Sequence, residues 1–309
     1  MNKNKFDLTN EDIKQGIENF FIQLLVEAKM EKADAKTLAD ISSEHPKISY
    51  ITGQPGAGKT SLNKQIKQEY EKNGECVVSI SPDKIATYHK YYNELLKLLP
   101  DECYSISRKF VTPACEIILK EVRSQNLNVI RESAFNKEEI DYERAKLFKD
   151  EGYEVEVNII IVDKYESFLS CIERDVKLLE KGYDPRPITK KNHDSMYESF
   201  LGEITEINNR GLCDNIRVFV RGEKLPKLVY ENGYNNYSCA REAIITERIK
   251  ARKKITLEPK EYLQRITSAR QKIVNLIKDE NMKNDYLKKI KELENEYKQE
   301  ISLCKKMEI

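Results

Sequence analysis

Histidine is scarce in this sequence, and no two cysteines form a CxxC pair. The 309 residues include three histidines and seven cysteines, and the cysteines are scattered singly. A zinc site needs clustered cysteine and histidine ligands, so the sequence argues against one. An odd number of dispersed thiols instead suits a reducing compartment, and we expect a cytoplasmic protein.

Long apolar runs and an excess of one charge are lacking as well. No window approaches the ~20 apolar residues of a membrane span. The first 15 residues do not contain the apolar stretch of a secretory signal. Lysine and arginine number 53 against 52 aspartate and glutamate, a net charge of +1. Proteins that bind nucleic acid usually carry a basic excess. We therefore expect neither a membrane nor a nucleic acid as partner.

What the sequence does contain is an alternation of strand-like and helix-like segments. Six short apolar runs predict strands: Ile48–Thr52, Cys76–Ser81, Asn128–Arg131, Val155–Val162, Asn215–Val220 and Lys227–Asn232. Apolar residues at helical spacing lie between the earlier runs. The fourth run is the most apolar, as is typical of a central strand covered on both faces. The alternation predicts a three-layer α/β fold with a mostly parallel sheet.

Helical segments flank this core at both ends. In residues 1–47, Asn10 can cap an amphipathic helix, which we expect to pack on the core. The core is assigned to residues 48–245 and a helical extension to residues 246–309. A basic stretch opens the extension, and two apolar stripes separated by the polar segment Asp279–Asp285 predict a helical hairpin over residues 257–309. The hairpin is expected to pack on the parent domain or to self-associate.

The segment after the first predicted strand carries the clearest chemical motif. Gly53–Thr60, GQPGAGKT, matches the phosphate-binding loop GxxxxGK[ST] and lies between a predicted strand and a predicted helix. Lys59 can reach the β- and γ-phosphates, and Thr60 can give its hydroxyl to Mg²⁺. The predicted cofactors are therefore ATP and Mg²⁺. The predicted cofactor-binding residues are Gly53, Gln54, Pro55, Gly56, Ala57, Gly58, Lys59, Thr60 and Ser61.

A kinase also needs a carboxylate that accepts the proton of the acceptor hydroxyl. Asp83 follows the second predicted strand, at the end where α/β sheets bind ligands. An ordinary turn aspartate after a proline is the alternative. Glu132 ends the third strand, at the same edge of the sheet as the phosphate loop. Glu116 is interpreted as opening a helix, where the helix dipole alone would favour a glutamate.

Two arginines complete the set of candidate residues. Arg174 falls on the helix after the fourth strand, and Arg186 lies between two prolines, which suits a rigid lid. Guanidinium groups stabilise negative charge on a transferring phosphoryl group. Two ordinary surface arginines are the alternative.

Taken in order, these elements resemble the zeta-toxin family of P-loop kinases over roughly residues 48–233. The matching features are the GQPGAGKT loop, Asp83 after the next strand, Val111-Thr112-Pro113 before Glu116, Glu132 at a strand end, Ile172-Glu173-Arg174, Arg186 ahead of Asn192-His193-Asp194, and Arg221-Gly222 after a late strand. The resemblance implies that Asp83 is the catalytic base and that Lys59, Arg174 and Arg186 act on the ATP phosphates. It places Glu116, Glu132 and the residue at position 136, here Asn136, around the acceptor.

The resemblance also implies an acceptor and a partner. Family members phosphorylate the 3′-hydroxyl on the amino sugar of UDP-N-acetylglucosamine and are restrained by a small helical antitoxin. The family pattern Glu-Gly-Thr, with an arginine two residues on, is here Glu132-Ser133-Ala134-Phe135-Asn136. Ala134 and Asn136 cannot make the contacts of the residues they replace. Two alternatives therefore stay open: a kinase of another small acceptor, as in chloramphenicol phosphotransferase-like proteins, and a non-catalytic nucleotide-binding switch.

Overall fold

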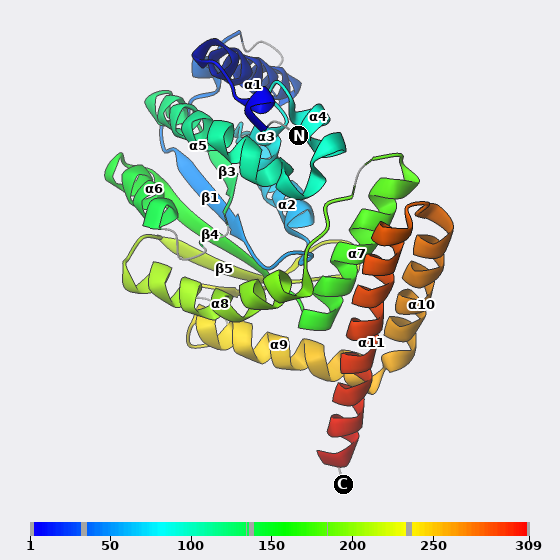
Figure 1. Cartoon of the computed structure of the whole chain (residues 1–309). Helices are drawn as coiled ribbons and strands as arrows, with labels where there is room; N and C mark the ends of the chain where they lie inside the picture. Colours follow the sequence, from blue (N-terminus) through cyan, green and yellow to red (C-terminus); the bar gives the residue numbers. More distant parts are fainter. Residues whose placement is uncertain are drawn as a thin grey trace. The chain divides into compact units, whose positions relative to one another are not determined.

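A six-stranded sheet with flanking helices makes up the part of the chain that the computed structural model describes, residues 3–31, 36–133, 135, 139–183, 185–232 and 237–307 (Figure 1). The strands are β1 (Lys47–Thr52), β2 (Val78–Ile80), β3 (Val129–Glu132), β4 (Glu154–Ile161), β5 (Asn215–Val220) and β6 (Lys227–Glu231). They are ordered β2-β3-β1-β4-β5-β6; β1 and β2 pair parallel with β3, and β6 pairs antiparallel with β5. The predicted mostly parallel α/β fold is confirmed.

The helices follow the predicted order with some corrections. They are α1 (Asn10–Glu31), α2 (Lys59–Lys72), α3 (Pro82–Ala86), α4 (Tyr92–Leu98), α5 (Pro100–Ser124), α6 (Glu139–Asp150), α7 (Lys164–Glu180), α8 (Lys190–Asn209), α9 (Ala240–Leu257), α10 (Pro259–Leu276) and α11 (Glu280–Met307). The helix α8 was not predicted, α9 begins before the helical extension assigned to residues 246–309, and α11 begins inside the segment expected to be a turn. Within the described ranges, no helix has both the length and the apolar character that crossing a bilayer takes.

The chain divides into two compact units, neither of them continuous in sequence. The first unit contains Met1–Thr52, Thr60–Asn158 and Ile207–Ile216, and the second contains Gly53–Lys59, Ile159–Glu206 and Arg217–Ile309. The domain boundaries assigned from the sequence, after residues 47 and 245, stay predictions.

In the first unit, α1 packs against α5 and β2. The approach is close, because a Cβ on Gly16 would lie 2.8 Å from the ring of Phe110. Phe20 is buried, with its ring edge-on to Tyr88 at a centroid distance of 5.4 Å. The N-terminal helix is therefore held to this unit by the packing of apolar side chains and by a close approach that the glycine permits.

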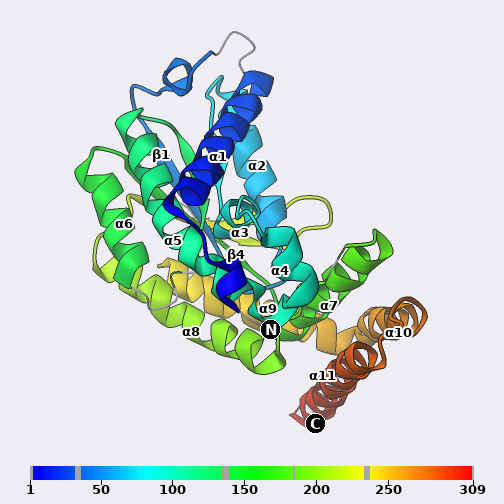
Figure 2. The same cartoon turned by 45° about the horizontal axis from the view of Figure 1, so that its top comes forward.

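In the second unit, the C-terminal helices pack on α7. The hairpin helices α10 and α11 lie side by side in both views (Figures 1 and 2), and one apolar cluster joins them to α7. Buried members from the hairpin are Tyr262, Ile266, Ala269, Ile273, Ile277, Tyr286, Ile290, Leu293 and Tyr297. Both predicted apolar stripes are thus covered by the chain's own α7.

Candidate active site

Of the phosphate loop, Gly53–Lys59 belongs to the second unit, and Thr60 belongs to the first. Gly56 has a φ of 76°, a left-handed conformation that favours glycine. A Cβ at this position would lie 2.0 Å from the carbonyl oxygen of Ser167 and 2.9 Å from Sγ of Cys171, both on α7. Since no side chain fits there, the loop is packed directly on the first turns of α7.

Lys59 folds its side chain back over this loop. Its Nζ donates to the carbonyl oxygens of Gly53 at 2.9 Å and Gln54 at 3.3 Å. Lys59 is also the first residue of the 14-residue helix α2, so the positive end of the helix dipole lies at this point of the chain. Thr60 and Ser61 follow with exposed side chains. A phosphate group fits these features, because a lysine, a helix N-terminus and a glycine-lined backbone together suit an anion.

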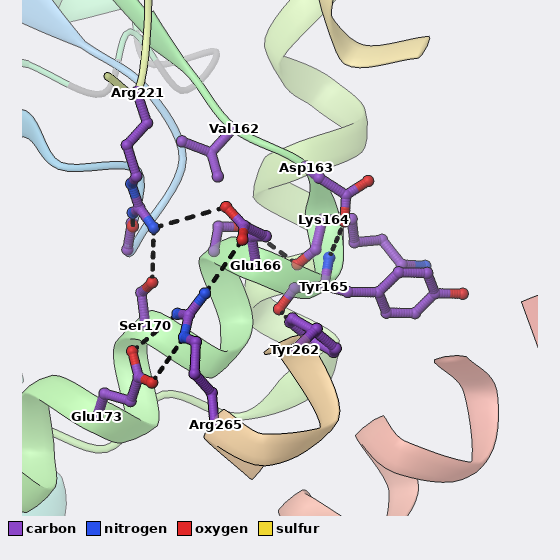
Figure 3. Close-up of polar contacts among 12 residues, drawn as sticks. Val162, Asp163, Lys164, Tyr165, Glu166, Ser170, Glu173, Arg221, Tyr262 and Arg265 are labelled. Carbon is purple, nitrogen blue, oxygen red and sulfur yellow. Dashed lines mark hydrogen bonds and ion pairs between the residues drawn. The ribbon is translucent and has the colours of Figure 1, made fainter. Parts of the chain in front are cut away.

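Arg221, the residue after β5, holds the loop from another side (Figure 3). Its Nη2 donates to the carbonyl oxygen of Gly56 at 2.5 Å, and its Nη1 donates to Oγ of Ser170 at 3.0 Å. A carbonyl oxygen in a phosphate-binding loop would repel an anion. The bond to a guanidinium offsets that negative charge, so Arg221 makes the loop more suitable for phosphate.

Asp175 brings the two predicted phosphate-binding arginines together. Its Oδ1 accepts from Nε and Nη2 of Arg174, at 3.1 and 2.9 Å, and from the backbone N–H of Arg186 at 3.2 Å. Nη2 of Arg174 also donates to the carbonyl oxygen of Arg186 at 2.5 Å. Arg174 lies on α7 and Arg186 in the loop after it, as predicted, and both residues are exposed. One carboxylate therefore fixes a side chain and a loop backbone in the same place.

Asp83 lies in the first unit, in the short helix α3 that directly follows β2. Oγ of Ser81 caps this helix by accepting from the backbone N–H of Lys84 at 3.1 Å. The side chain of Lys84 is bonded to both carboxylate oxygens of Glu27, at 2.7 and 2.9 Å. Asp83 itself is exposed. Its position beyond the second strand is confirmed, and its role as a base stays a prediction.

Glu116 lies in the middle of α5, so the expectation that it opens a helix is wrong. The helix begins at Pro100 and continues through Pro113, which removes the helix-dipole explanation for a glutamate here. Ile117, the next residue, is 49% exposed. The Glu116 carboxylate instead accepts from the guanidinium of Arg144 on α6, with Nε at 2.9 Å and Nη2 on the same oxygen.

A buried charge cluster lies beside this ion pair. Arg131 is 1% exposed and donates to Sγ of Cys115 at 3.2 Å and to Oδ1 of Asp141 at 3.3 Å. Asp141 also accepts from Ser133 at 2.6 Å and from Nη1 of Arg144 at 3.0 Å. Burial alone would raise the pKa of Asp141, but the Arg131 guanidinium and the Ser133 hydroxyl hold that pKa below its ordinary value. The cluster is therefore charged at neutral pH.

Glu132 ends β3, as predicted, and lies opposite Ile51 of β1 in the parallel register. It is half-buried. Ala134 and Asn136, the positions that depart from the family pattern, lie outside the described residues. The assignment of Asn136 to the acceptor site stays a prediction.

Three residues that organise these groups were given no role from the sequence: Arg144, Asp175 and Arg221, the last named only as part of the family resemblance. Asp175 directly follows Arg174 in the sequence and falls on the apolar face of its helix. A carboxylate among apolar residues is a local signal of a buried charge. Arg221 follows the end of a strand, where ligand-binding residues gather. Arg144 has no comparable local signal for its contact with Glu116, because Glu116 lies on another helix.

Comparison with known proteins decides the family. A family model described as Zeta toxin matches residues 30–233, more than half of the chain. The chain belongs to the zeta toxin family. Toxin zeta of Streptococcus agalactiae is 28% identical over 212 residues, covering 66% of this family member and 71% of that protein. Toxin PezT of Streptococcus pneumoniae serotype 4 is 24% identical over 225 residues, 71% of this chain and 87% of that protein. The match to toxin zeta of Streptococcus pyogenes spans 63% of that protein.

Solved structures agree on the fold of this zeta toxin family member. A structure from the PezAT chromosomal toxin–antitoxin system of Streptococcus pneumoniae superposes with a TM-score of 0.63 at 19% identity, covering 94% of this chain and 98% of that one. The AvrRxo1-ORF1:-ORF2 complex superposes with a TM-score of 0.53 at 17% identity, covering 90% and 83%. At these identities the likeness concerns the fold alone. The first match extends over nearly the whole chain and thus beyond the segment that the family model matches.

Proposed function

We propose that this protein is an ATP- and Mg²⁺-dependent kinase that phosphorylates the 3′-hydroxyl on the amino sugar of UDP-N-acetylglucosamine, as the toxin of a toxin–antitoxin pair. The observation that carries the proposal is the phosphate loop, with Nζ of Lys59 held at the loop carbonyls and Gly56 packed on α7. Membership of the zeta toxin family supports the acceptor and the toxin role.

Each candidate residue has a role in this proposal. Bound ATP-Mg²⁺ supplies the γ-phosphoryl group. Lys59 and the loop N–H groups bind its phosphates, and the hydroxyl of Thr60 coordinates the metal ion. Arg174 and Arg186 stabilise the negative charge on the group in transfer. The Asp175 contacts support this pairing, because they already hold Arg174 at the backbone of Arg186.

Asp83 is the proposed base, and Glu116, Glu132 and Asn136 bind the acceptor. The acceptor oxygen forms a bond to the γ-phosphorus while the bond to the β,γ-bridging oxygen breaks, and ADP leaves. The proton of the hydroxyl passes to the carboxylate of Asp83. The exposure of Asp83 supports this role, since a base must be accessible to its acceptor.

The proposed partner is a small helical antitoxin, and the proposed compartment is the cytoplasm. The structure with the TM-score of 0.63 comes from a toxin–antitoxin system, and the AvrRxo1 structure is a complex of two components. The cysteines are free thiols, which supports a reducing compartment.

A phosphate-transfer assay tests the proposal. Purified protein is incubated with ATP-Mg²⁺ and UDP-N-acetylglucosamine, and products are identified by mass spectrometry and phosphorus NMR. We expect a new phosphomonoester on the amino sugar, and we expect Lys59→Ala to abolish it. ADP without a phosphorylated sugar would rule out this acceptor and favour another one, such as chloramphenicol. ATP binding without any ADP would favour the nucleotide-binding switch.

A further inference from the structure

Tyr286, near the start of α11, connects the C-terminal hairpin to the two phosphate-binding arginines. Its hydroxyl donates to Oδ2 of Asp175 at 2.8 Å, and the two residues are 2% and 1% exposed. The other oxygen of this carboxylate holds Arg174 and Arg186. Burial raises the pKa of Tyr286 above its ordinary value, so the hydroxyl stays protonated and remains a donor.

Arg265, on α10, makes a second connection, this time to the phosphate loop (Figure 3). Its guanidinium donates to both carboxylate oxygens of Glu173, at 3.0 and 2.9 Å, and to Oε1 of Glu166 at 3.1 Å. Oε2 of Glu166 lies 3.8 Å from Nη1 of Arg221. Arg221 in turn donates to the carbonyl oxygen of Gly56. Charged groups of alternating sign therefore run from the hairpin to the loop.

We infer that the hairpin α10–α11 is a positioning element of the phosphate site, with Tyr286 and Arg265 as its positioning residues. The inference rests on the proposed kinase function. The hairpin lies outside residues 30–233, so the match to the family model does not account for it. Neither residue touches a reacting atom in this proposal. Tyr286 acts through Asp175 on the arginines, and Arg265 acts through Glu166 on the loop.

The two connections affect different kinetic quantities. Arg174 and Arg186 act on charge that develops in the transition state, so displacing them lowers kcat more than it changes the KM for ATP. The loop binds phosphates in the ground state as well, so disturbing Arg221 weakens nucleotide binding. Loss of the first connection should therefore lower kcat, and loss of the second should lower the affinity for ATP. A general loosening of the hairpin would change both quantities together.

Tyr286→Phe tests the first connection, with Tyr262→Phe as a matched control. Tyr262 is also a buried hairpin tyrosine, and its hydroxyl donates at 2.8 Å to the carbonyl oxygen of Tyr165, away from Asp175. We expect Tyr286→Phe to lower kcat by about 10- to 100-fold, the cost of misplacing a catalytic group by about 1 Å, with little change in the KM for ATP. Tyr262→Phe should keep the wild-type kcat. Equal kcat values for the two variants would overturn the inference.

A readout that needs no turnover keeps this test separate from the proposed function. The Nε–H NMR resonance of Arg174 should shift in Tyr286→Phe and stay in place in Tyr262→Phe. If the wild type transfers no phosphate, the kinase proposal fails, yet this resonance still decides whether Tyr286 positions Arg174. An unchanged resonance in both variants would overturn the positioning role.

Arg265→Gln tests the second connection, with Arg270→Gln as its control. Arg270 lies on the same helix and pairs with Glu294 of α11 instead of with α7. We expect Arg265→Gln to raise the Kd of a non-hydrolysable ATP analogue about tenfold, the scale of one charge-assisted hydrogen bond. Arg270→Gln should bind the analogue like the wild type. A wild-type Kd in Arg265→Gln would overturn this part of the inference.

Discussion

The guanidinium of Arg144, on α6, holds the carboxylate of Glu116, on α5, with Nε 2.9 Å from Oε1. Glu116 is a predicted acceptor-binding residue, and its side chain is 48% exposed, whereas that of Arg144 is 9% exposed. The arginine is thus the buried half of the pair. It holds a carboxylate whose side chain stays about half exposed to solvent.

Arg144→Lys should weaken acceptor binding while ATP affinity is kept. A lysine keeps the positive charge but lacks the planar guanidinium. In Arg144 that group contacts Glu116 and Asp141 through different nitrogen atoms at once. We expect kcat/KM for the acceptor to fall about 10-fold, corresponding to ~1.4 kcal/mol. Arg123→Lys is the control, because Arg123 lies on α5, as Glu116 does, and pairs with Glu151. The role of Arg144 is excluded if the two variants have the same kcat/KM.

Asp83→Asn should separate catalysis from nucleotide binding. Asparagine has a similar shape but cannot accept the proton of a hydroxyl group. The expected fall in turnover is ~10²–10⁴-fold, the usual contribution of a positioned general base, with the Kd of ATP unchanged. Asp150→Asn is the control, since Asp150 is an exposed aspartate of the same unit that pairs with Lys146. Turnover near that of the wild type would show that Asp83 is not the base.

The strands and the phosphate loop were predictable because their signals are local. A run such as Ile48–Thr52 buries consecutive side chains, and the structure has β1 at Lys47–Thr52. The loop motif depends on glycines and a lysine within eight positions of each other. Such patterns need no knowledge of the rest of the chain.

The start of α5 and the support of the site were not predictable in this way. Pro113 argues against a helix interior by local preference, yet the buried neighbours Phe110, Ala114 and Ile118 keep the helix continuous through it. Tertiary packing therefore overrides propensity. Tyr286 and Asp175 are 111 positions apart, and no local pattern indicates which buried tyrosine meets which carboxylate.

Gly56→Ala should disrupt the phosphate loop far more than left-handed strain alone would. Alanine at a positive φ costs roughly 1–2 kcal/mol, and at position 56 its Cβ would also lie 2.0 Å from the carbonyl oxygen of Ser167. Gly74→Ala isolates the strain, because Gly74 has a φ of 73° and no heavy atom of the described residues would lie within 4 Å of the added methyl group. We expect Gly56→Ala to lose ATP binding measured by calorimetry, and Gly74→Ala to keep it. Retained binding in Gly56→Ala would mean that the loop can move off α7.

His193 should make the protein less stable as the pH falls below neutrality. The residue is fully buried; its Nε2 lies 2.9 Å from Oγ of Ser167, and its Nδ1 lies 3.0 Å from Oδ1 of Asp194. Burial lowers the pKa of His193, and the positive charges of Lys190 and Lys164 act in the same direction, against the opposing effect of Asp194. The folded protein therefore keeps this imidazole neutral at a pH where the unfolded chain protonates it.

The sign of the effect follows from proton linkage. Below the unfolded-state pKa of about 6.5, the unfolded chain binds a proton that the folded protein does not. The free energy of unfolding therefore falls as the pH drops from about 7.5 to about 5.5, by at most ~1.4 kcal/mol per pH unit for one proton. His193→Gln should reduce that slope in urea unfolding followed by circular dichroism. His89, whose pKa burial also lowers, leaves a residual slope of the same sign. His45→Gln, at an exposed position, controls for the loss of a histidine, and a slope in His193→Gln equal to that of the wild type would assign the pH dependence to other groups.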